Sequence, residues 1–458
     1  MIKAKFRANI VRLILLLFLL LCAVFIFRYT ASAKDWAFFQ TNSHVYTGGK
    51  LTQAGEITDR EGRTLSKTED GKRVYNKNKD IRKATIHAVG DHDGYISTGV
   101  TNALKDKLVG YSLVNGVYTY SGKGNNANLT IDANISVAAM KALGSSAGCV
   151  GVCNYKTGEV LCMVSTPTYD IENLKEYEKA KNGELGSVFM NRFISSAYTP
   201  GSTFKIITSA AAIETLGEAA YDMDFNCDYG TVIEGEKLNC LGKHKTVTLK
   251  RAFSHSCNAY FSNMALTLGK STMTKYAEKF GFNKTFLIDG IKCAKTSYSV
   301  KNSRNIDFGW SGIGQHKNLC NPVQYLCMVS AIANGGEYKE PFLVNSITAS
   351  NGKLLYEAKP KTVRMIKKDT ADKLAFLMDY AAKDNYGKST FGTLDVCGKT
   401  GTAEVGKKME NSLFIGFCKD ENLPLAFVVI AEGDENGRKS AMSVANKTLQ
   451  AAKKQLIK

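Results

Sequence analysis

A long uncharged stretch near the N-terminus restricts what the first part of the chain can fold into. Residues 13–27 are apolar, and three basic residues precede them between positions 3 and 7. Together with the residues just before them, including Arg12, whose charge can reach toward the lipid surface, residues 10–27 are long enough to cross a bilayer as a helix. The positive flank then places residues 1–9 in the cytoplasm and the remaining chain outside the membrane.

A cleaved signal peptide is the competing interpretation of this stretch. Ala31, Ser32 and Ala33 fit the pattern of small residues at a processing site. However, the apolar run is longer than the core of most signal peptides. We therefore favour an uncleaved, single-pass membrane anchor.

The composition is that of a globular protein with a basic surface. With 458 residues, 44% hydrophobic and 22% charged, the chain can form two or three domains rather than a disordered segment. The formal net charge of +18 reflects either a lysine-rich surface or attraction to anionic lipid or cell-wall polymer. Zinc-finger spacing and RNA-binding signatures are absent from the sequence, which argues against nucleic acid as a partner.

The 12 cysteines form no obvious metal-binding pattern. Cys149, Cys153 and Cys162 lie on apolar, strand-like runs and are expected to be small core residues. Cys227 and Cys240 flank a glycine-containing turn, so they form a disulfide in an oxidising compartment or stay as free thiols. Many unpaired cysteines outside the cytosol would suggest a reducing habitat.

The pattern of strands and helices predicts a small β-rich domain followed by a larger α+β domain. Residues 34–128 alternate short β-like runs with turns, and the polar stretch 121–128 is the expected boundary. In 129–458, strands come first, helices follow and strands return, which indicates an antiparallel sheet with helices on its faces. We expect strands near 147–152, 159–164, 393–397, 412–418 and 423–431, and helices near 202–216, 247–268, 271–281, 321–335, 368–385 and 441–456.

Ser202 and Lys205 are the first candidate catalytic pair. Pro200 and Gly201 end the preceding element, and the apolar residues that follow recur at helical spacing. The hydroxyl and the amine therefore share one face of the first helical turn, where an amine can activate a serine nucleophile. A Ser-x-x-Lys pattern also arises by chance in a chain of this length, so the pair depends on support from elsewhere.

Two later groups supply polar side chains of the same kind. Ser256 and Asn258 lie between apolar residues, as in a tight corner between helices, although an isolated Ser-x-Asn is more often a helix cap. Lys399 and Thr400 follow a predicted strand and offer a charge and a hydroxyl to a substrate carboxylate. Gly401 allows another backbone to come close.

The order of these groups resembles the three motifs of penicillin-binding proteins and serine β-lactamases, here Ser202-Thr203-Phe204-Lys205, Ser256-Cys257-Asn258 and Lys399-Thr400-Gly401-Thr402. Further stretches resemble class B penicillin-binding proteins, namely 57–65, 166–170, 314–315, 333–336 and 414–417. The resemblance covers nearly the whole chain after the anchor. Departures are His316, where glycine is usual, residues 321–324, and Ala54-Gly55 at the entry to the N-terminal domain. They bear on the subfamily rather than on the three motifs.

The resemblance implies a five-stranded antiparallel sheet and a peptidoglycan D,D-transpeptidase. Ser202 would attack the carbonyl between the two D-alanines of a stem peptide, with Lys205 as its base. Ser256 would pass a proton to the leaving D-alanine, and Asn258 would hold Lys205 and the substrate amide. β-Lactams would acylate Ser202.

The third motif would bind the substrate. Lys399 and Thr400 would hold the carboxylate, and Gly401 and Thr402 would also line the substrate. The backbone N–H groups of Ser202 and Thr402 would form the oxyanion hole. The partners implied are stem peptides ending in D-Ala-D-Ala, β-lactams, the membrane and a separate glycan polymerase. We expect no cofactor, no metal and no nucleic acid.

Other functions stay open at this point. A D,D-carboxypeptidase would use the same residues but transfer the acyl group to water. A β-lactam sensor or a β-lactamase would also carry the three motifs, but a sensor needs a signalling domain and a β-lactamase needs no anchor or N-terminal domain. A Ser-His-Asp hydrolase is disfavoured because the sequence contains only six histidines.

Overall fold

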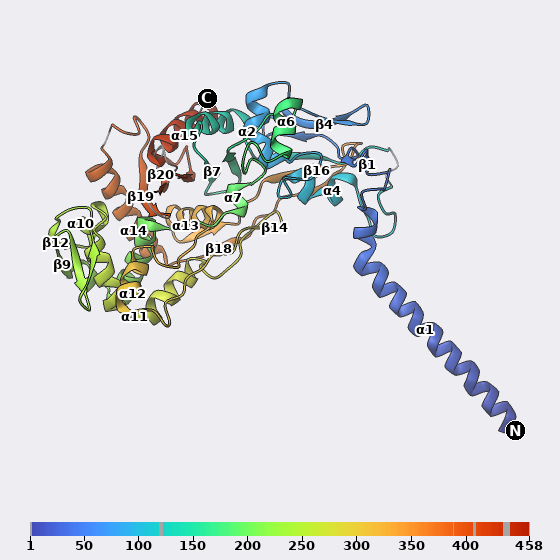
Figure 1. Cartoon of the computed structure of the whole chain (residues 1–458), viewed down its shortest axis with the longest axis horizontal. Coiled ribbons are helices and arrows are strands. Elements are labelled where there is room, and N and C mark those ends of the chain that lie inside the picture. Colours follow the sequence, from blue (N-terminus) through green and yellow to red (C-terminus); the bar gives the residue numbers. More distant parts are fainter. Residues whose placement is uncertain (1, 119–121, 388, 406–408, 434–439, 458) are drawn as a thin grey trace.

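A single long helix carries the N-terminus away from the rest of the molecule. The computed structural model describes residues 2–118, 122–387, 389–405, 409–433 and 440–457. Helix α1 (Ile2–Ala37) projects from the body (Figure 1), and its most apolar window has a mean hydropathy of 3.1 and is not buried. By length and composition α1 suits a membrane span, although a signal sequence has the same properties.

An antiparallel five-stranded sheet forms the centre of the larger part. Its strand order is β19-β20-β21-β7-β8, and every neighbouring pair is antiparallel. The strands are β7 (Gly148–Asn154), β8 (Val160–Thr166), β19 (Val396–Glu404), β20 (Glu410–Cys418) and β21 (Leu425–Ala431). The predicted strands at the two ends of the larger domain therefore meet in one sheet, with β19 at its edge.

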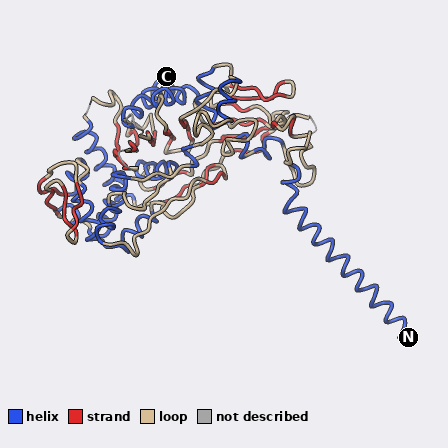
Figure 2. The backbone as a smooth tube through the Cα atoms, viewed as in Figure 1, coloured by secondary structure: helices blue, strands red, loops and turns tan. Residues whose placement is uncertain are grey.

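Both faces of this sheet are covered, and the strand residues alternate between two cores. Phe427 and Val429 pack in one core with α5 (Ala133–Leu143) and α15 (Ala441–Leu456), whereas Val428 belongs to the other core. Helix α13 (Pro322–Ala333) contacts β20 and β21 on that second face. This two-residue alternation follows from the pleat of a strand. Figure 1 shows α15 and α13 on opposite sides of the sheet, and Figure 2 shows the same helices in blue around the red strands.

A second large sheet combines segments that lie far apart in the sequence. Its order is β17-β16-β6-β3-β4-β5, and β3 pairs with β6 in parallel. The strands are β3 (Ile57–Thr58), β4 (Thr64–Glu69), β5 (Lys72–Tyr75), β6 (Asn126–Leu129), β16 (Val344–Thr348) and β17 (Leu354–Glu357). The α+β expectation thus holds, but the antiparallel sheet is accompanied by this mixed sheet and, within the described residues, by five separate pairs of strands.

The segment 34–128 is less purely β than its sequence suggested. It contains α2 (Lys79–Val89), α3 (Val100–Ala103) and α4 (Lys105–Val109) beside its strands. Asn78 caps α2 by accepting a hydrogen bond from the Asp80 backbone N–H, a signal that sequence reading missed. Strand β6 crosses the expected boundary at residue 128, and Ser121, the first residue of the boundary stretch, lies outside the described residues.

The remaining elements complete the chain, and those between residues 201 and 279 carry the candidate site together with strand β19 and η2. Strands β9 and β12 pair with each other, β10 pairs with β11, and this small lobe lies at the end of the molecule away from α1 (Figure 1). The bounds are β1 (Tyr46–Thr47), β2 (Lys50–Leu51), α6 (Leu174–Lys181), α7 (Arg192–Ser195), the 3-10 turn η1 (Gly201–Phe204), α8 (Lys205–Leu216), α9 (Ala219–Asp222), β9 (Asp224–Cys227), β10 (Gly230–Ile233), β11 (Glu236–Asn239), β12 (Lys245–Thr248), α10 (Leu249–Ser254), α11 (Asn258–Lys279), β13 (Leu287–Ile288), β14 (Ile291–Lys292), α12 (Asn305–Gly312), β15 (Glu337–Lys339), β18 (Thr362–Arg364), α14 (Lys368–Ala381) and the π-helical turn η2 (Ala382–Tyr386).

We predict that the aromatic core under α15 contributes strongly to stability. Phe427 is fully buried in β21, so Phe427→Ala should lower the free energy of unfolding by about 3–5 kcal/mol. Phe376, in α14, is 53% exposed, and Phe376→Ala should cost less than about 1 kcal/mol. Thermal unfolding of the two variants in detergent measures the difference. Equal losses would contradict this description of the core.

Candidate active site

Ser202 and Lys205 lie next to each other at the start of a buried helix. Ser202 is in the 3-10 turn η1, and Lys205 is the first residue of α8, so the expected helix begins with a tighter turn. The Lys205 Nζ donates to Ser202 Oγ at 3.1 Å. Gly201 permits this turn because its φ is 54° and a Cβ atom there would lie 2.3 Å from the Thr402 carbonyl oxygen.

The second motif forms the predicted corner between two helices. Ser256 lies between α10 and α11 with a φ of 54°, a left-handed conformation that is uncommon for serine. Lys205 Nζ lies 2.6 Å from the Ser256 carbonyl oxygen, 3.1 Å from Ser256 Oγ and 2.7 Å from Asn258 Oδ1. The amine therefore joins the first and second motifs.

Lys399 brings the third motif to the same hydroxyl. Its Nζ donates to Ser256 Oγ at 3.1 Å and to the Thr400 carbonyl oxygen at 3.1 Å. Ser256 Oγ thus lies within hydrogen-bond distance of two lysine amines, one from α8 and one from β19. The five predicted catalytic residues converge: Ser202, Lys205, Ser256, Asn258 and Lys399.

Burial shifts the pKa of both lysines downward. Both side chains have no exposed surface. Burial lowers the pKa of Lys205 to about 8, against an opposing effect of nearby cysteine thiols. Burial also lowers the pKa of Lys399 well below its usual value, and the charge of Lys205 lowers it further. A lysine with a pKa near neutrality can serve as a general base.

Thr400, Gly401 and Thr402 line the edge of the five-stranded sheet. The Thr400 N–H donates to the Tyr386 hydroxyl at 3.1 Å, so it points away from the neighbouring strand β20. Thr402 is two residues further along β19, and its N–H points to the same side by the period of a strand. A Cβ atom on Gly401 would lie 2.9 Å from Thr203 Cγ2, so this position packs directly against the serine turn.

Three aromatic residues of the site were not predicted from the sequence. Tyr386 contacts Thr400 through both the backbone N–H and, at 3.2 Å, the side-chain hydroxyl. The rings of Phe261 and Phe253 lie 5.7 Å from the amines of Lys205 and Lys399, respectively. Such ring faces attract a cation and partly offset its burial. Nothing in their local sequence distinguishes these residues from ordinary core aromatics.

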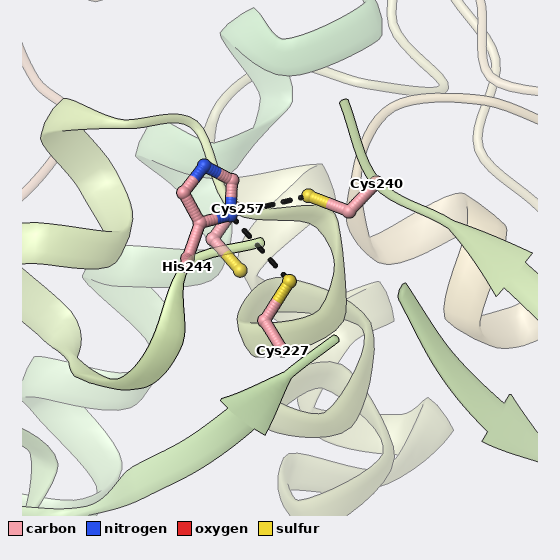
Figure 3. Close-up of side chains that lie close together, drawn as sticks. All are labelled: Cys227, Cys240, His244 and Cys257. Carbon is pink, nitrogen blue, oxygen red and sulfur yellow. Dashed lines mark hydrogen bonds between the residues drawn. The ribbon is translucent and has the colours of Figure 1, made fainter. Parts of the chain in front are cut away.

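Four further side chains meet beside the second motif. Cys227, Cys240, His244 and Cys257 bring their sulfur and nitrogen atoms within 4.8 Å of one another (Figure 3). Sequence reading found no metal-binding pattern, because the four residues lie at the end of a strand, at two loop positions and at the cap of a helix. Cys227 and Cys240 are free thiols, so the disulfide considered above is not formed. Cys149, Cys153 and Cys162 are buried core residues, as predicted.

Comparisons with known proteins agree with this geometry. A family model described as the penicillin binding protein transpeptidase domain matches residues 148–450. The peptidoglycan D,D-transpeptidase PbpA of Mycolicibacterium smegmatis is 27% identical over 443 residues, which cover 88% of this chain and 88% of that protein. Stage V sporulation protein D of Bacillus subtilis is 28% identical over 342 residues, which cover 70% of this chain and 51% of that protein.

Solved structures show the same fold. The D,D-transpeptidase domain of a peptidoglycan glycosyltransferase from Eggerthella lenta has a TM-score of 0.75 at 25% identity, over 88% of this chain and 99% of that one. The penicillin G acyl-enzyme complex of penicillin-binding protein A from M. tuberculosis has a TM-score of 0.75 at 25% identity, over 87% of this chain and 99% of that one. The family model matches more than half of the length of this chain. The chain therefore belongs to the penicillin-binding protein transpeptidase family.

Proposed function

We propose that the chain is a membrane-anchored, class B peptidoglycan D,D-transpeptidase that forms an acyl-enzyme on Ser202. One observation carries the proposal: a single buried amine, Lys205 Nζ, is hydrogen-bonded to Ser202 Oγ and Ser256 Oγ at 3.1 Å each. The similarity to a D,D-transpeptidase and to a structure with a penicillin G acyl-enzyme supports the same conclusion.

Acylation transfers one proton through the lysine. Ser202 Oγ attacks the carbonyl between the two D-alanines while neutral Lys205 accepts the hydroxyl proton. The N–H groups of Ser202 and Thr402 stabilise the resulting oxyanion. As the peptide bond breaks, the proton passes through Ser256 Oγ to the departing D-alanine amine, and an ester remains on Ser202.

Deacylation reverses these roles. An amine from a neighbouring stem peptide attacks the ester, its proton returns to Ser202 Oγ through the same groups, and a new peptide bond forms. Water in place of the amine would make the enzyme a D,D-carboxypeptidase. A β-lactam would acylate Ser202 in the same way, because its amide takes the place of the D-Ala-D-Ala bond.

The substrate carboxylate binds at the edge strand. Lys399 supplies the charge, and Thr400 supplies its hydroxyl, which Tyr386 orients at 3.2 Å. Gly401 lets the substrate and the serine turn come close, and Asn258 positions Lys205 through its Oδ1 atom at 2.7 Å. A carboxylate beside Lys399 favours the charged form of this lysine, which burial alone disfavours.

The order of the segments along the chain fits a single-pass membrane protein. Residues 1–9 are the cytoplasmic tail and 10–27 the membrane span. Outside the membrane, residues 34–128 form the N-terminal pedestal domain and 129–458 the transpeptidase domain. The apolar, exposed surface of α1 supports this arrangement. A separate membrane polymerase supplies the glycan strands that the enzyme cross-links.

A fluorescent penicillin should label Ser202 of the purified chain. Peptide mapping should find the label on the peptide that contains Ser202, and Ser202→Ala should abolish it because the substitution removes the attacking oxygen. Ser195→Ala removes an exposed serine in α7 and should keep full labelling. Label on another peptide, or label in Ser202→Ala, would contradict the assigned nucleophile.

Acylation should become faster as the pH rises toward about 8 and level off above it. Only neutral Lys205 accepts a proton, and its neutral fraction grows as the pH approaches this lowered pKa. Lys205→Ala should slow acylation by roughly 10²- to 10⁴-fold and remove this rise. Lys275→Ala, an exposed lysine of α11, is the matched control and should keep the profile. The second-order rate constant with penicillin, measured across pH, tests the base; an unchanged profile in Lys205→Ala would exclude it.

Transpeptidase activity should appear as cross-linked stem peptides. We would incubate the full chain with lipid-linked substrate and a glycan polymerase, then separate the digested products. Cross-linked dimers that have lost one D-alanine per link are expected, and Ser202→Ala should form none. If stems are only trimmed, transfer to water is favoured and the enzyme is a D,D-carboxypeptidase. A protein that is acylated but turns over no substrate would be a sensor.

A further inference from the structure

We propose that Cys227, Cys240, His244 and Cys257 form a structural Zn²⁺ site that holds the second active-site motif in place. Their four ligand atoms lie within 4.8 Å of one another, and they come from four separate points of the chain (Figure 3). A ligand set of three thiolates and one imidazole is typical of structural zinc, which is bound in tetrahedral geometry.

The distances suit that geometry. His244 Nδ1 lies 3.5 Å from Cys227 Sγ and 3.4 Å from Cys240 Sγ. With typical Zn–S and Zn–N bond lengths, a tetrahedral site has a sulfur–nitrogen separation of about 3.5 Å and a sulfur–sulfur separation of about 3.8 Å. All distances between the four ligand atoms are at most 4.8 Å, which is about 1 Å longer than the sulfur–sulfur separation of a tetrahedral zinc site. Small rotations of the side chains close this difference.

Hydrogen bonds alone explain the cluster less well. The Nδ1 atom of an imidazole has either one lone pair or one N–H, so it serves one partner well rather than two. Here two sulfur atoms approach the same Nδ1 at nearly equal distances, and Figure 3 shows both contacts as dashed lines. A metal ion at the centre satisfies all four groups at once. Zinc binding would release the thiol protons and end the contact of Cys227 Sγ with the Gly242 carbonyl oxygen at 3.4 Å.

Backbone N–H groups already point at two of the sulfur atoms. The Asn258 N–H donates to Cys240 Sγ at 3.2 Å, and the Tyr260 N–H donates to Cys257 Sγ at 3.5 Å. Such donors stabilise a metal-bound thiolate and fix its orientation. Both come from the first turn of α11, so the start of this helix contributes to the site.

The surroundings also need a cross-link of this kind. The lobe consists of two separate two-stranded sheets, β9 with β12 and β10 with β11, and small units with little core are often stabilised by a metal. Cys227 ends β9, Cys240 follows β11, and His244 precedes β12. Zinc would tie both pairs of strands to the start of α11.

The position of Cys257 connects the metal to the active site. Cys257 lies between Ser256 and Asn258, which both bind Lys205 Nζ. A metal ion bound to the Cys257 sulfur would fix the backbone of the corner between α10 and α11, including Ser256 in its left-handed conformation. Zinc is therefore a positioning element here, and this second part of the inference rests on the proposed function.

Metal content tests the site without any substrate. The full-length chain, purified in detergent under reducing conditions, should contain roughly one zinc per molecule by atomic emission. Cys240→Ser and His244→Ala should fall below roughly a tenth of that value. His255→Ala, the neighbouring imidazole, and Cys293→Ser, another buried cysteine, are matched controls and should keep the zinc.

Cobalt tests the geometry if a variant fails to fold. Wild-type protein stripped of metal and given Co²⁺ alone should show the intense visible absorption of tetrahedral thiolate coordination, and added Zn²⁺ should displace it. Reduced wild-type protein that contains no zinc and binds neither ion would overturn the site. Octahedral cobalt absorption would overturn the assigned ligand set.

Acylation tests the positioning role. Stripping zinc from the wild type should slow labelling of Ser202 roughly ten- to a hundredfold, and Zn²⁺ but not Mg²⁺ should restore it while the circular dichroism spectrum stays the same. An unchanged rate would overturn the positioning role. Zinc-loaded protein that penicillin never labels would instead overturn the proposed function, so the two failures are distinguishable.

Discussion

The buried amine of Lys205 is the interaction on which the architecture of the site depends. Removing a lysine side chain from water costs several kcal/mol unless polar partners replace the water. Here the amine lies within hydrogen-bond distance of four oxygen atoms from Ser202, Ser256 and Asn258. These partners lie on η1, at the α10–α11 corner and at the start of α11, so burying one lysine requires distant segments to meet in one geometry.

The candidate catalytic residues were predictable from three short motifs taken together and from the family that these motifs resemble. The three-residue spacing of Ser202 and Lys205 places them on one face wherever the segment is helical. The apolar residues before Lys399 predict a strand next to it, and in the structure that strand extends through Lys399 as β19. The non-local features were not predictable in this way. Strand β6 pairs with β16, more than 200 residues away, and neither segment carries a signal that names its partner. The contact of Tyr386 with Thr400 and the meeting of Cys227 with Cys257 depend on the same long-range packing.

The corner at Ser256 shows how strain and positioning are combined. A left-handed serine costs roughly 1–3 kcal/mol and persists only where its surroundings hold it. The backbone N–H groups on either side bind carbonyl oxygens of α10: Ser256 N–H donates to Phe253 at 3.2 Å and Cys257 N–H to Ala252 at 2.9 Å. The side chain then lies between two lysines. The proposed metal would act on this corner from its other side, through Cys257.

Two lysines that share one hydroxyl respond to substrate as a pair. Burial and the charge of Lys205 keep the pKa of Lys399 low while the site lacks an anion. A substrate carboxylate beside Lys399 would favour its protonated form, and that new charge near Ser256 Oγ would disfavour a proton on Lys205. Under the proposed mechanism, Lys205 must be neutral when Ser202 attacks. The proposed mechanism therefore couples the two lysines through one hydroxyl, with Lys399 holding the carboxylate and Lys205 acting as the base.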